Sequence, residues 1–410
     1  MKRKPSPLRL SAPLVGALLL FPSVAHAGDS PKLPTPTTEE RIEYIRRARV
    51  WEPTDVSSKN LFNGPQGELK FAVDQEITCD FVPKVLEGWT EKFLCRLDDG
   101  RILKVKYVAG DRYKEVYGEV LGTRLFWALG FYADRMLPVR VTCRGCPRLP
   151  WKYVNKRKNK RSFDKDGLIR ALPAEAEVGT YTFDPAAMEE KLDAEPIEER
   201  ENQGWSWKAL KRVDPSLGGA TKAEIDALKL LNAFVQNADD KFKQNSLVCP
   251  RNELVTSAAG DVTCRRPVLY VDDLGAVFGK GGFTTFGPGR VDYAGWKKRP
   301  VWRNPRSCKA RLASIGWIVR TSTLRNPRIS EEGRALLAKQ LGELSDAQIA
   351  DLFRAARIER LHQTMPDGSS GRREVTVADW VALFKKKRDE ITKHPGCGTQ
   401  RRTQPEEAVR

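Results

Sequence analysis

Three short runs rich in apolar residues, separated by turn residues, predict three consecutive strands. The runs cover 81–86, 92–97 and 101–107. Asp98, Asp99 and Gly100 separate the last two runs, and these residue types tolerate the positive φ angles that tight hairpin turns require. We therefore expect antiparallel strands from about Cys79 onward.

A helical period follows these strands. Apolar side chains recur every three or four residues between 112 and 129, and Gly130 is suited to end a helix there. The predicted apolar face consists of Val116, Val120, Leu121, Leu125 and Leu129. Residues 138–141 predict one more strand after this helix.

The second half of the chain is predicted to be mainly helical. Thr221 with Glu224 and Ser345 with Gln348 have the spacing of capping boxes, which satisfy the first backbone N–H groups of a helix. Residues 376–384 predict a further helix. Strands with one long helix, followed by a helical half, predict an α+β fold with an antiparallel-sheet N-lobe and a mainly helical C-lobe.

The first residues predict export. A basic start, an apolar stretch at 12–24 and the small residues Ala25 and Ala27 form the pattern of a secretory signal peptide. The mature protein is therefore expected in the periplasm or outside the cell. No later segment is long and apolar enough to predict a transmembrane helix.

These patterns divide the chain into six expected parts. The parts are a signal peptide at 1–27, a linker and N-terminal extension at 28–75, an N-lobe at 76–146, a hinge-side insertion at 147–215, a helical C-lobe at 216–400 and a disordered tail at 401–410. Within the insertion, residues 189–201 are expected to be helical in part. Trp205 and Trp207 are expected to anchor the return of the chain to the core.

Eight cysteines fit an oxidising compartment, in which thiols pair. The pairs expected from their positions are Cys79 with Cys95, Cys143 with Cys146, Cys249 with Cys264 and Cys308 with Cys397. Zinc or redox chemistry at the C-x-x-C of Cys143 and Cys146 is the alternative. Zinc would need further ligands, and only His362 and His394 remain after the signal peptide.

The formal net charge of +18 predicts attraction to polyanions and anionic surface polymers. The basic residues are distributed along the chain instead of being confined to one helix. This distribution gives no reason to expect a specific nucleic-acid site, and it is also what an ordinary basic exported protein would have.

Four elements with phosphoryl-transfer chemistry follow one another along the chain. They are a lysine late in the third predicted strand (Lys104 or Lys106), Glu119 in the helix, Asp240 with Asn245 after the capped helix, and Asp273 after the apolar run 268–271. Transfer of phosphate from ATP uses a lysine held by a glutamate, an aspartate at the acceptor, and an asparagine and an aspartate on metal ions. The spacing of Asp240 and Asn245 is that of the kinase catalytic loop.

Taken in this order, the motifs resemble those of the atypical protein-kinase-like superfamily, in particular its lipid-kinase, HipA-type and secretory-pathway Golgi kinase branches, as an exported bacterial-type member. The matching segments are Lys106, 118–120, 128–131, 137–139, 237–245 and 270–275. The resemblance covers roughly residues 79–360. It implies a bilobal kinase-like fold.

The resemblance also implies roles for the residues. Lys106, with Lys104 as the alternative, would bind the phosphates of ATP, and Glu119, with Glu115 as the alternative, would orient that lysine. Asp240 would act on the acceptor hydroxyl of a protein, sugar or small molecule. Asn245 and Asp273 would hold Mg²⁺ or Mn²⁺, with Asp272 beside them.

Three features depart from the ordinary kinase pattern. The catalytic loop has no H-R-D sequence, the first hairpin around Gly88 is poor in glycine, and the segment from Asn245 to Asp273 is long. A secreted pseudokinase that binds nucleotide without turnover, and a basic polyanion-binding protein, are therefore the alternative hypotheses. Residues 279–289 are rich in glycine and resemble an activation loop or an ordinary surface loop.

Overall fold

The computed structural model describes most of the chain between residues 31 and 397. The described ranges are 31–110, 114–157, 163–164, 166–199, 204–281, 283–284, 287–288, 290–313, 324–368 and 371–397. The signal peptide expected at 1–27 and the tail expected at 401–410 lie outside the described residues. So do residues 158–162 of the expected insertion.

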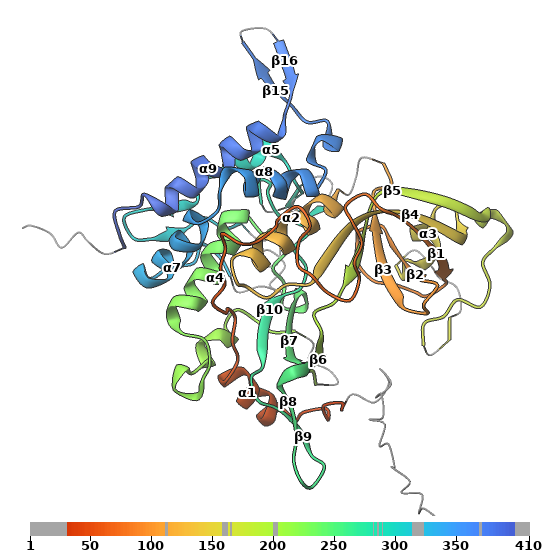
Figure 1. Cartoon of the computed structure of the whole chain (residues 1–410), viewed down its shortest axis with the longest axis horizontal. Coiled ribbons are helices and arrows are strands. Elements are labelled where there is room, and N and C mark those ends of the chain that lie inside the picture. The colour runs from red at the N-terminus through yellow and green to blue at the C-terminus, as the bar shows by residue number, and fades with distance from the viewer. Residues whose placement is uncertain are drawn as a thin grey trace, which may run out of the picture.

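Five strands close into a barrel, which lies at one end of the molecule (Figure 1). They are β1 (Glu76–Val82), β2 (Lys92–Arg96), β3 (Ile102–Tyr107), β4 (Arg135–Pro147) and β5 (Val178–Glu190), in the order β1-β2-β3-β5-β4. The hairpin predicted at 98–100 joins β2 and β3. The predicted antiparallel pairing of the three strands in series is confirmed, and β5 also pairs antiparallel with β3 and β4, but β1 and β4 run parallel where they close the barrel.

Two strands of the barrel differ from the sequence-based expectation. The first strand ends at Val82, because Pro83 has no N–H to continue the ladder, and Lys84 and Leu86 form only isolated bridges. Strand β5 lies within the segment expected to be an insertion, where it pairs with both β3 and β4. Residues 189–199 contain the end of β5 and the short β6 (Ala194–Pro196) instead of the partial helix that we expected.

Helix α2 (Glu115–Ala128) lies between the barrel and the helical part of the molecule. Almost every one of its residues is buried, since the helix packs against structure on all sides. Its interior side chains belong to the larger hydrophobic core, whereas the barrel encloses a second core around Phe93, Tyr107 and Phe183. Gly130, with φ of +83°, ends the helix as predicted.

The helical part follows α2 along the chain. Its helices are α4 (Lys222–Val235), α5 (Tyr293–Lys297), α7 (Glu331–Gly342), α8 (Asp346–Ala355) and α9 (Val377–Thr392), and α1 (Thr38–Arg46) and α3 (Pro150–Val154) lie outside it. Both predicted capping boxes are present, at Thr221 and Ser345. The expected anchors Trp205 and Trp207 are buried in the main core.

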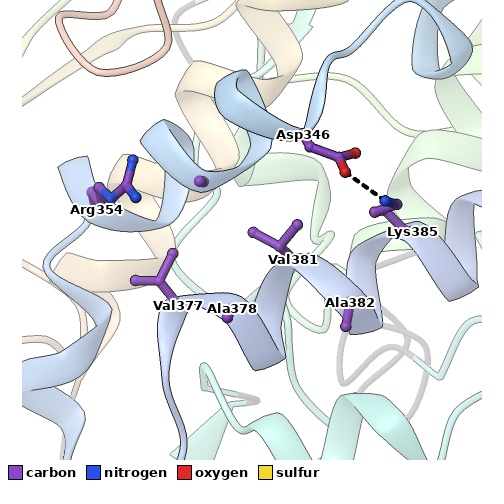
Figure 2. A pocket seen from close by; sticks show the side chains of 8 residues that line it. Asp346, Arg354, Val377, Ala378, Val381, Ala382 and Lys385 are labelled. Atoms are coloured by element: carbon purple, nitrogen blue, oxygen red, sulfur yellow. Dashed lines mark hydrogen bonds and ion pairs between the residues drawn. The ribbon is translucent and has the colours of Figure 1, made fainter.

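Helices α8 and α9 lie side by side, and a shallow apolar groove runs between them (Figure 2). Val377, Val381 and Ala382 of α9 line this groove. An ion pair of 2.5 Å between Asp346 and Lys385 closes one end of it.

Short strands complete the fold. A three-stranded sheet contains β10 (Val268–Val271), β7 (Asn245–Pro250) and β6, in that order. Four two-stranded ribbons are formed by β8 (Leu254–Thr256) with β9 (Val262–Cys264), β11 (Phe283–Thr284) with β12 (Gly287–Pro288), β13 (Trp302–Asn304) with β14 (Lys309–Ala310), and β15 (Thr364–Asp367) with β16 (Gly371–Glu374).

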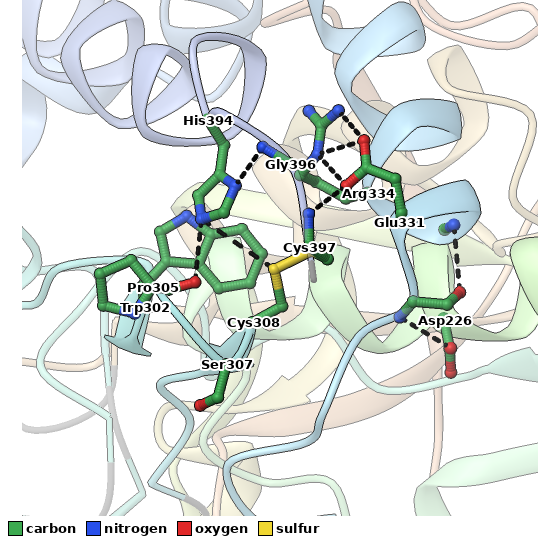
Figure 3. Close-up of a disulfide and its surroundings, with 12 residues drawn as sticks. Asp226, Trp302, Pro305, Ser307, Cys308, Glu331, Arg334, His394, Gly396 and Cys397 are labelled. Atoms are coloured by element: carbon green, nitrogen blue, oxygen red, sulfur yellow. Dashed lines mark hydrogen bonds and ion pairs between the residues drawn. A yellow bond between two sulfur atoms is a disulfide. The ribbon is translucent and has the colours of Figure 1, made fainter. Parts of the chain in front are cut away.

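All four expected disulfides are confirmed. They join Cys79 to Cys95, Cys143 to Cys146, Cys249 to Cys264 and Cys308 to Cys397. The Cys308–Cys397 bond ties the chain after α9 to the turn before β14, beside His394 (Figure 3). Because Cys143 and Cys146 are bonded to each other, neither offers zinc a thiolate in this structure.

Within the described ranges, none of the helices has the length and the apolar character needed to cross a membrane.

Candidate functional site

Lys106 and Glu119 form the buried centre of the candidate site. Lys106 lies on β3 and is 6% exposed, Glu119 lies on α2 and is 1% exposed, and the ammonium bonds the carboxylate directly. Lys104 projects from the same face of β3 and donates to Glu189 of β5 at 2.8 Å. The structure thus brings the expected lysine and glutamate together, and Glu189, the main partner of Lys104, lies 4.0 Å from Lys106.

The loop that carries Asp273 packs closely on α2 because glycines face each other there. A Cβ atom on Gly118 would lie 2.1 Å from the carbonyl oxygen of Gly275, and one on Gly122 would lie 2.6 Å from Cβ of Leu274. Only hydrogen fits at these positions. Asp273 therefore follows β10 directly into contact with the helix that holds Glu119.

The charges at Asp273 and Lys106 stabilise each other. Burial favours the neutral form of Asp273, but the charge of Lys106 and the N–H of Gly275 outweigh burial and lower its pKa. Burial likewise disfavours the ammonium of Lys106, yet Glu119 and Asp273 raise its pKa. Burial, with Asp273 nearby, raises the pKa of Glu119.

A third carboxylate reaches the same cluster from the loop after α4. The side-chain amide of Gln244 donates to Asp239 at 2.9 Å and to Asp273 at 3.1 Å. Burial is the main cause that raises the pKa of Asp239, and the charge of Asp273 adds to it. We call Lys106, Glu119, Asp239, Gln244 and Asp273 the Lys106 cluster.

Two of the residues expected from the kinase-like spacing lie next to this cluster. Asp240 is fully buried, and its carbonyl oxygen accepts a hydrogen bond of 3.2 Å from Trp207. Asn245 begins β7, and its side-chain amide donates to the carbonyl of Trp205 at 2.9 Å. The side chain of Gln244 thus hydrogen-bonds Asp273 and links it to Asp239, and these two residues each lie one position before the pair that the sequence suggested.

The oxygen atoms of the cluster suit a hard divalent cation. Asp239 and Asp273 supply carboxylates, which Mg²⁺ and Mn²⁺ prefer as ligands. The side-chain oxygens of Gln244 and Asn245 are buried, and within the described part of the chain neither accepts a hydrogen bond. A buried acceptor without a donor is costly, and a cation at this position would satisfy it.

Glu115, the alternative to Glu119, contributes to the same electrostatic field from one turn earlier on α2. Burial, followed by the charge of Asp273, raises its pKa to about 7, and Thr90 of the β1–β2 segment hydrogen-bonds it. Lys92 of β2 also lies within this field, because Asp273 and Glu115 both act on its pKa. Lys241 adds a further positive charge nearby, because its ammonium lies 2.9 Å from the carboxylate of Asp239.

A second polar group, which we call the Lys191 cluster, lies beside the first. The ammonium of Lys191 contacts Asp134 at 2.7 Å, Glu189 at 2.8 Å and Asp272 at 2.5 Å. The oxygens of these three carboxylates lie within 4.8 Å of one another, a spacing that suits a metal ion. In this structure the lysine supplies the cation, so the neighbours Asp272 and Asp273 belong to different clusters.

Sequence reasoning missed Lys92, Asp134, Gln244, Glu189 and Lys191. Lys92 had a usable signal, because a turn centred on Asp99 pairs Lys92 with Lys106 across the hairpin. The signal for Asp239 and Gln244 was weaker. These two residues have the same spacing as Asp240 and Asn245 and lie one position earlier in the sequence. Asp134, Glu189 and Lys191 come together through β5, which the sequence did not reveal.

Comparison with known proteins finds no family model and no curated protein that matches the chain. Among solved structures, the proinflammatory kinase CtkA of Helicobacter pylori is similar with a TM-score of 0.39 and 8% identity, over 78% of this chain and 95% of that one. A Golgi casein kinase with Mn/ADP bound is similar with a TM-score of 0.30 and 9% identity, over 78% of this chain and 72% of that one. With both scores below 0.5, neither similarity assigns a function to this chain.

Proposed function

We propose that this chain is an exported kinase-like phosphotransferase of two lobes, which moves the γ-phosphate of ATP to a hydroxyl group with Mg²⁺ or Mn²⁺. The observation that carries the proposal is the Lys106 cluster itself. Amine, carboxylate and amide groups from β3, α2, the loop after α4 and the loop after β10 meet in one buried place.

Each residue has a role in this proposal. Lys106, fixed by Glu119, binds phosphate oxygens, and Asp273 with Gln244 or Asn245 holds the metal. Asp239, which is 7% exposed, is better placed than the fully buried Asp240 to accept the proton of an acceptor hydroxyl. When bound, a divalent ion supplies charge neutralisation at the phosphate oxygens. The protein itself positions the phosphates, the metal and the acceptor hydroxyl, and it excludes water from the site.

Transfer of labelled phosphate tests this proposal. Purified mature protein is incubated with γ-labelled ATP and Mn²⁺, and labelled protein and released phosphate are measured. We expect metal-dependent transfer to the protein itself or to water, and its loss in Asp273→Asn and Lys106→Met. Equal rates in the wild type and both variants, or no transfer in any of them, would contradict an active enzyme.

A pseudokinase is the second candidate, and burial favours it. Lys106, Glu119, Asp239 and Asp240 are all less than 9% exposed, so the site is closed to large substrates in this conformation. Nucleotide binding without transfer would support this alternative. Salt-sensitive binding to polyanions, with no effect of nucleotide, would instead support a basic polymer-binding protein.

Export is a separate part of the proposal, and the four disulfides support it. We expect mature protein that begins after Ala27 and contains no thiol that reacts before reduction. The intact mass and alkylation with and without reductant measure both properties. A retained N-terminus together with eight alkylated cysteines would contradict it.

A further inference from the structure

Three lysines project from the same face of the β2–β3 hairpin, toward the Lys106 cluster. Lys104 and Lys106 alternate along β3, and Lys92 of β2 lies directly opposite Lys106 in the antiparallel register. Like charges at directly opposed positions repel each other. A pair of this kind persists only where something else compensates it.

The three lysines differ in their partners. Lys104 is paired with Glu189 at 2.8 Å, and Lys106 is bonded to Glu119. Within the described part of the chain, Lys92 has no carboxylate at ion-pair distance. Its ammonium lies 5.5 Å from the ring centre of Trp151, which is a weaker contact than an ion pair.

The surroundings of Lys92 are unfavourable to a positive charge. Burial is the largest cause that lowers its pKa, to about 8, and the charges of Lys106 and Lys104 lower it further. Asp273 and Glu115 oppose this effect from a longer range. An anion bound beside Lys92 would offset the repulsion between the opposed lysines.

The turn above Lys92 is shaped around its ammonium. A Cβ atom on Gly88 would lie 2.7 Å from Nζ of Lys92, and the φ of Gly88 is +111°. A side chain at this position would press on the ammonium and strain the backbone. Gly88 is the only glycine between 83 and 91, so this segment has little of the bare backbone with which glycine-rich loops surround phosphates.

We infer that Lys92 is the main cation that binds the polyphosphate of the nucleotide, opposite Lys106 and beneath Gly88. This inference rests on the proposed function and deepens it. Lys106 is already paired with Glu119, whereas Lys92 has no carboxylate at ion-pair distance among the described residues and can pair with an incoming anion. One lysine side chain would thus do the work that backbone N–H groups do in a glycine-rich loop.

Calorimetric titration of the mature protein with three probes tests the inference. The probes are ATP, inorganic tripolyphosphate and adenosine, each in the presence of Mn²⁺. We expect Lys92→Met to weaken binding of ATP and of tripolyphosphate by about tenfold or more, because a hydrogen bond to a charged group is lost. Adenosine, which has no phosphate, should bind the variant and the wild type equally.

Lys84→Met is the matched control, because Lys84 is an exposed lysine of the same β1–β2 segment. It should leave all three affinities unchanged, and Lys92→Arg should retain part of the phosphate affinity.

Binding of ATP that is equal in the wild type and Lys92→Met would overturn the inference and leave the proposed function standing. If tripolyphosphate binding depends on Lys92 but ATP does not bind, the claim that the ligand is a nucleotide would be overturned, whereas the role of Lys92 in binding polyphosphate would be supported. Failure of the wild type to bind either phosphate would overturn both.

Discussion

The Lys106 cluster and the Lys191 cluster are neighbours of similar composition, yet only one of them is complete. Lys191 touches three carboxylates, and Asp134 also accepts from the hydroxyl of Tyr270 and the N–H of Leu192. In and beside the Lys106 cluster, by contrast, the described residues offer no donor to the buried side-chain oxygens of Gln244 and Asn245 and no carboxylate at ion-pair distance to Lys92.

The electrostatic surroundings of the two clusters also differ. Burial, followed by the charge of Asp272, raises the pKa of Asp134 in the Lys191 cluster. Lys191 contacts all three carboxylates of this cluster, and Lys104 also pairs with Glu189. Near Asp273, the charges of Lys104 and Lys106 act against the ammonium of Lys92, and burial with the charge of Asp273 raises the pKa of Glu115 to about 7. We therefore interpret the Lys191 cluster as structural and the Lys106 cluster, whose neighbourhood holds buried oxygens that lack donors, as the site prepared for ligands.

Replacement of either of the adjacent residues Asp272 and Asp273 by asparagine gives the largest expected difference in the rate of phosphate transfer. Asp273→Asn should lower metal-dependent transfer by roughly 100-fold or more, because it removes charge that is positioned for a metal. Asp272→Asn should keep transfer within about threefold and lose about 1 kcal/mol of stability, as one contact of Lys191 is weakened. Initial rates and urea unfolding of both variants measure this. Similar losses of transfer in the two variants would remove the distinction between the clusters.

Removal of Lys191 should be the largest change in stability. Lys191→Met leaves three carboxylates without their cation, but the side chain is 51% exposed, so solvent reduces the cost to about 3 kcal/mol of unfolding free energy. The close oxygens should then bind an added divalent ion. We therefore expect Mn²⁺ to raise the Tm of the variant more than that of Asp272→Asn. A variant as stable as the wild type would show that the cluster is not structural.

Removal of Lys92 should stabilise the protein, whereas removal of Lys191 should destabilise it. The pKa of Lys92 is about 8 in the folded protein, below the value of about 10.4 for an unfolded lysine. The unfolded chain binds the extra proton, so the charge costs stability below pH 8, and this cost disappears as the pH rises toward 10.4. Lys92→Met should therefore gain about 2 kcal/mol at pH 7 without ligand and nothing above pH 10.5. Unfolding free energies at several pH values measure the gain, and a loss at pH 7 would contradict the account.

Replacement of the side-chain amides of Gln244 and Asn245, one at a time, gives the smallest expected effect on ATP binding. Gln244→Leu should weaken Mn²⁺-dependent ATP binding by about tenfold, because its amide faces Asp239 and Asp273. Asn245→Leu should mainly lower Tm, because the amide of Asn245 supports the backbone at Trp205. Titration and thermal unfolding of the two variants separate these outcomes. A larger binding loss in Asn245→Leu would restore the register expected from the sequence.

Local signals predicted those parts of the fold that depend on near neighbours. The capping boxes at Thr221 and Ser345 and the turn at 98–100 each involve residues a few positions apart, and all three are present. Three of the disulfides followed from the same local reasoning, since their cysteines lie 3 to 16 residues apart, whereas Cys308 and Cys397, 89 residues apart, were the pair that remained. The order of lysine, glutamate and aspartates also indicated which side chains would meet.

Long-range pairing could not be predicted in this way. Strand β5 pairs with β3 some 80 residues earlier, so nothing in its own neighbourhood indicates that it closes a barrel. The register around β7 could not be predicted either, because Gln244 and Asn245 are adjacent and only the position of β7 against β10 decides which side chain faces Asp273. Single-residue choices of this kind depend on packing across the whole site.

Anomalous diffraction from crystals with Mn²⁺ and a non-hydrolysable ATP analogue tests the central claim most directly. We predict a manganese peak at the oxygens of Asp273 and Gln244, with the phosphates between Lys92 and Lys106. A peak among Asp134, Glu189 and Asp272 with Lys191 displaced, or no peak at either cluster, would contradict the account.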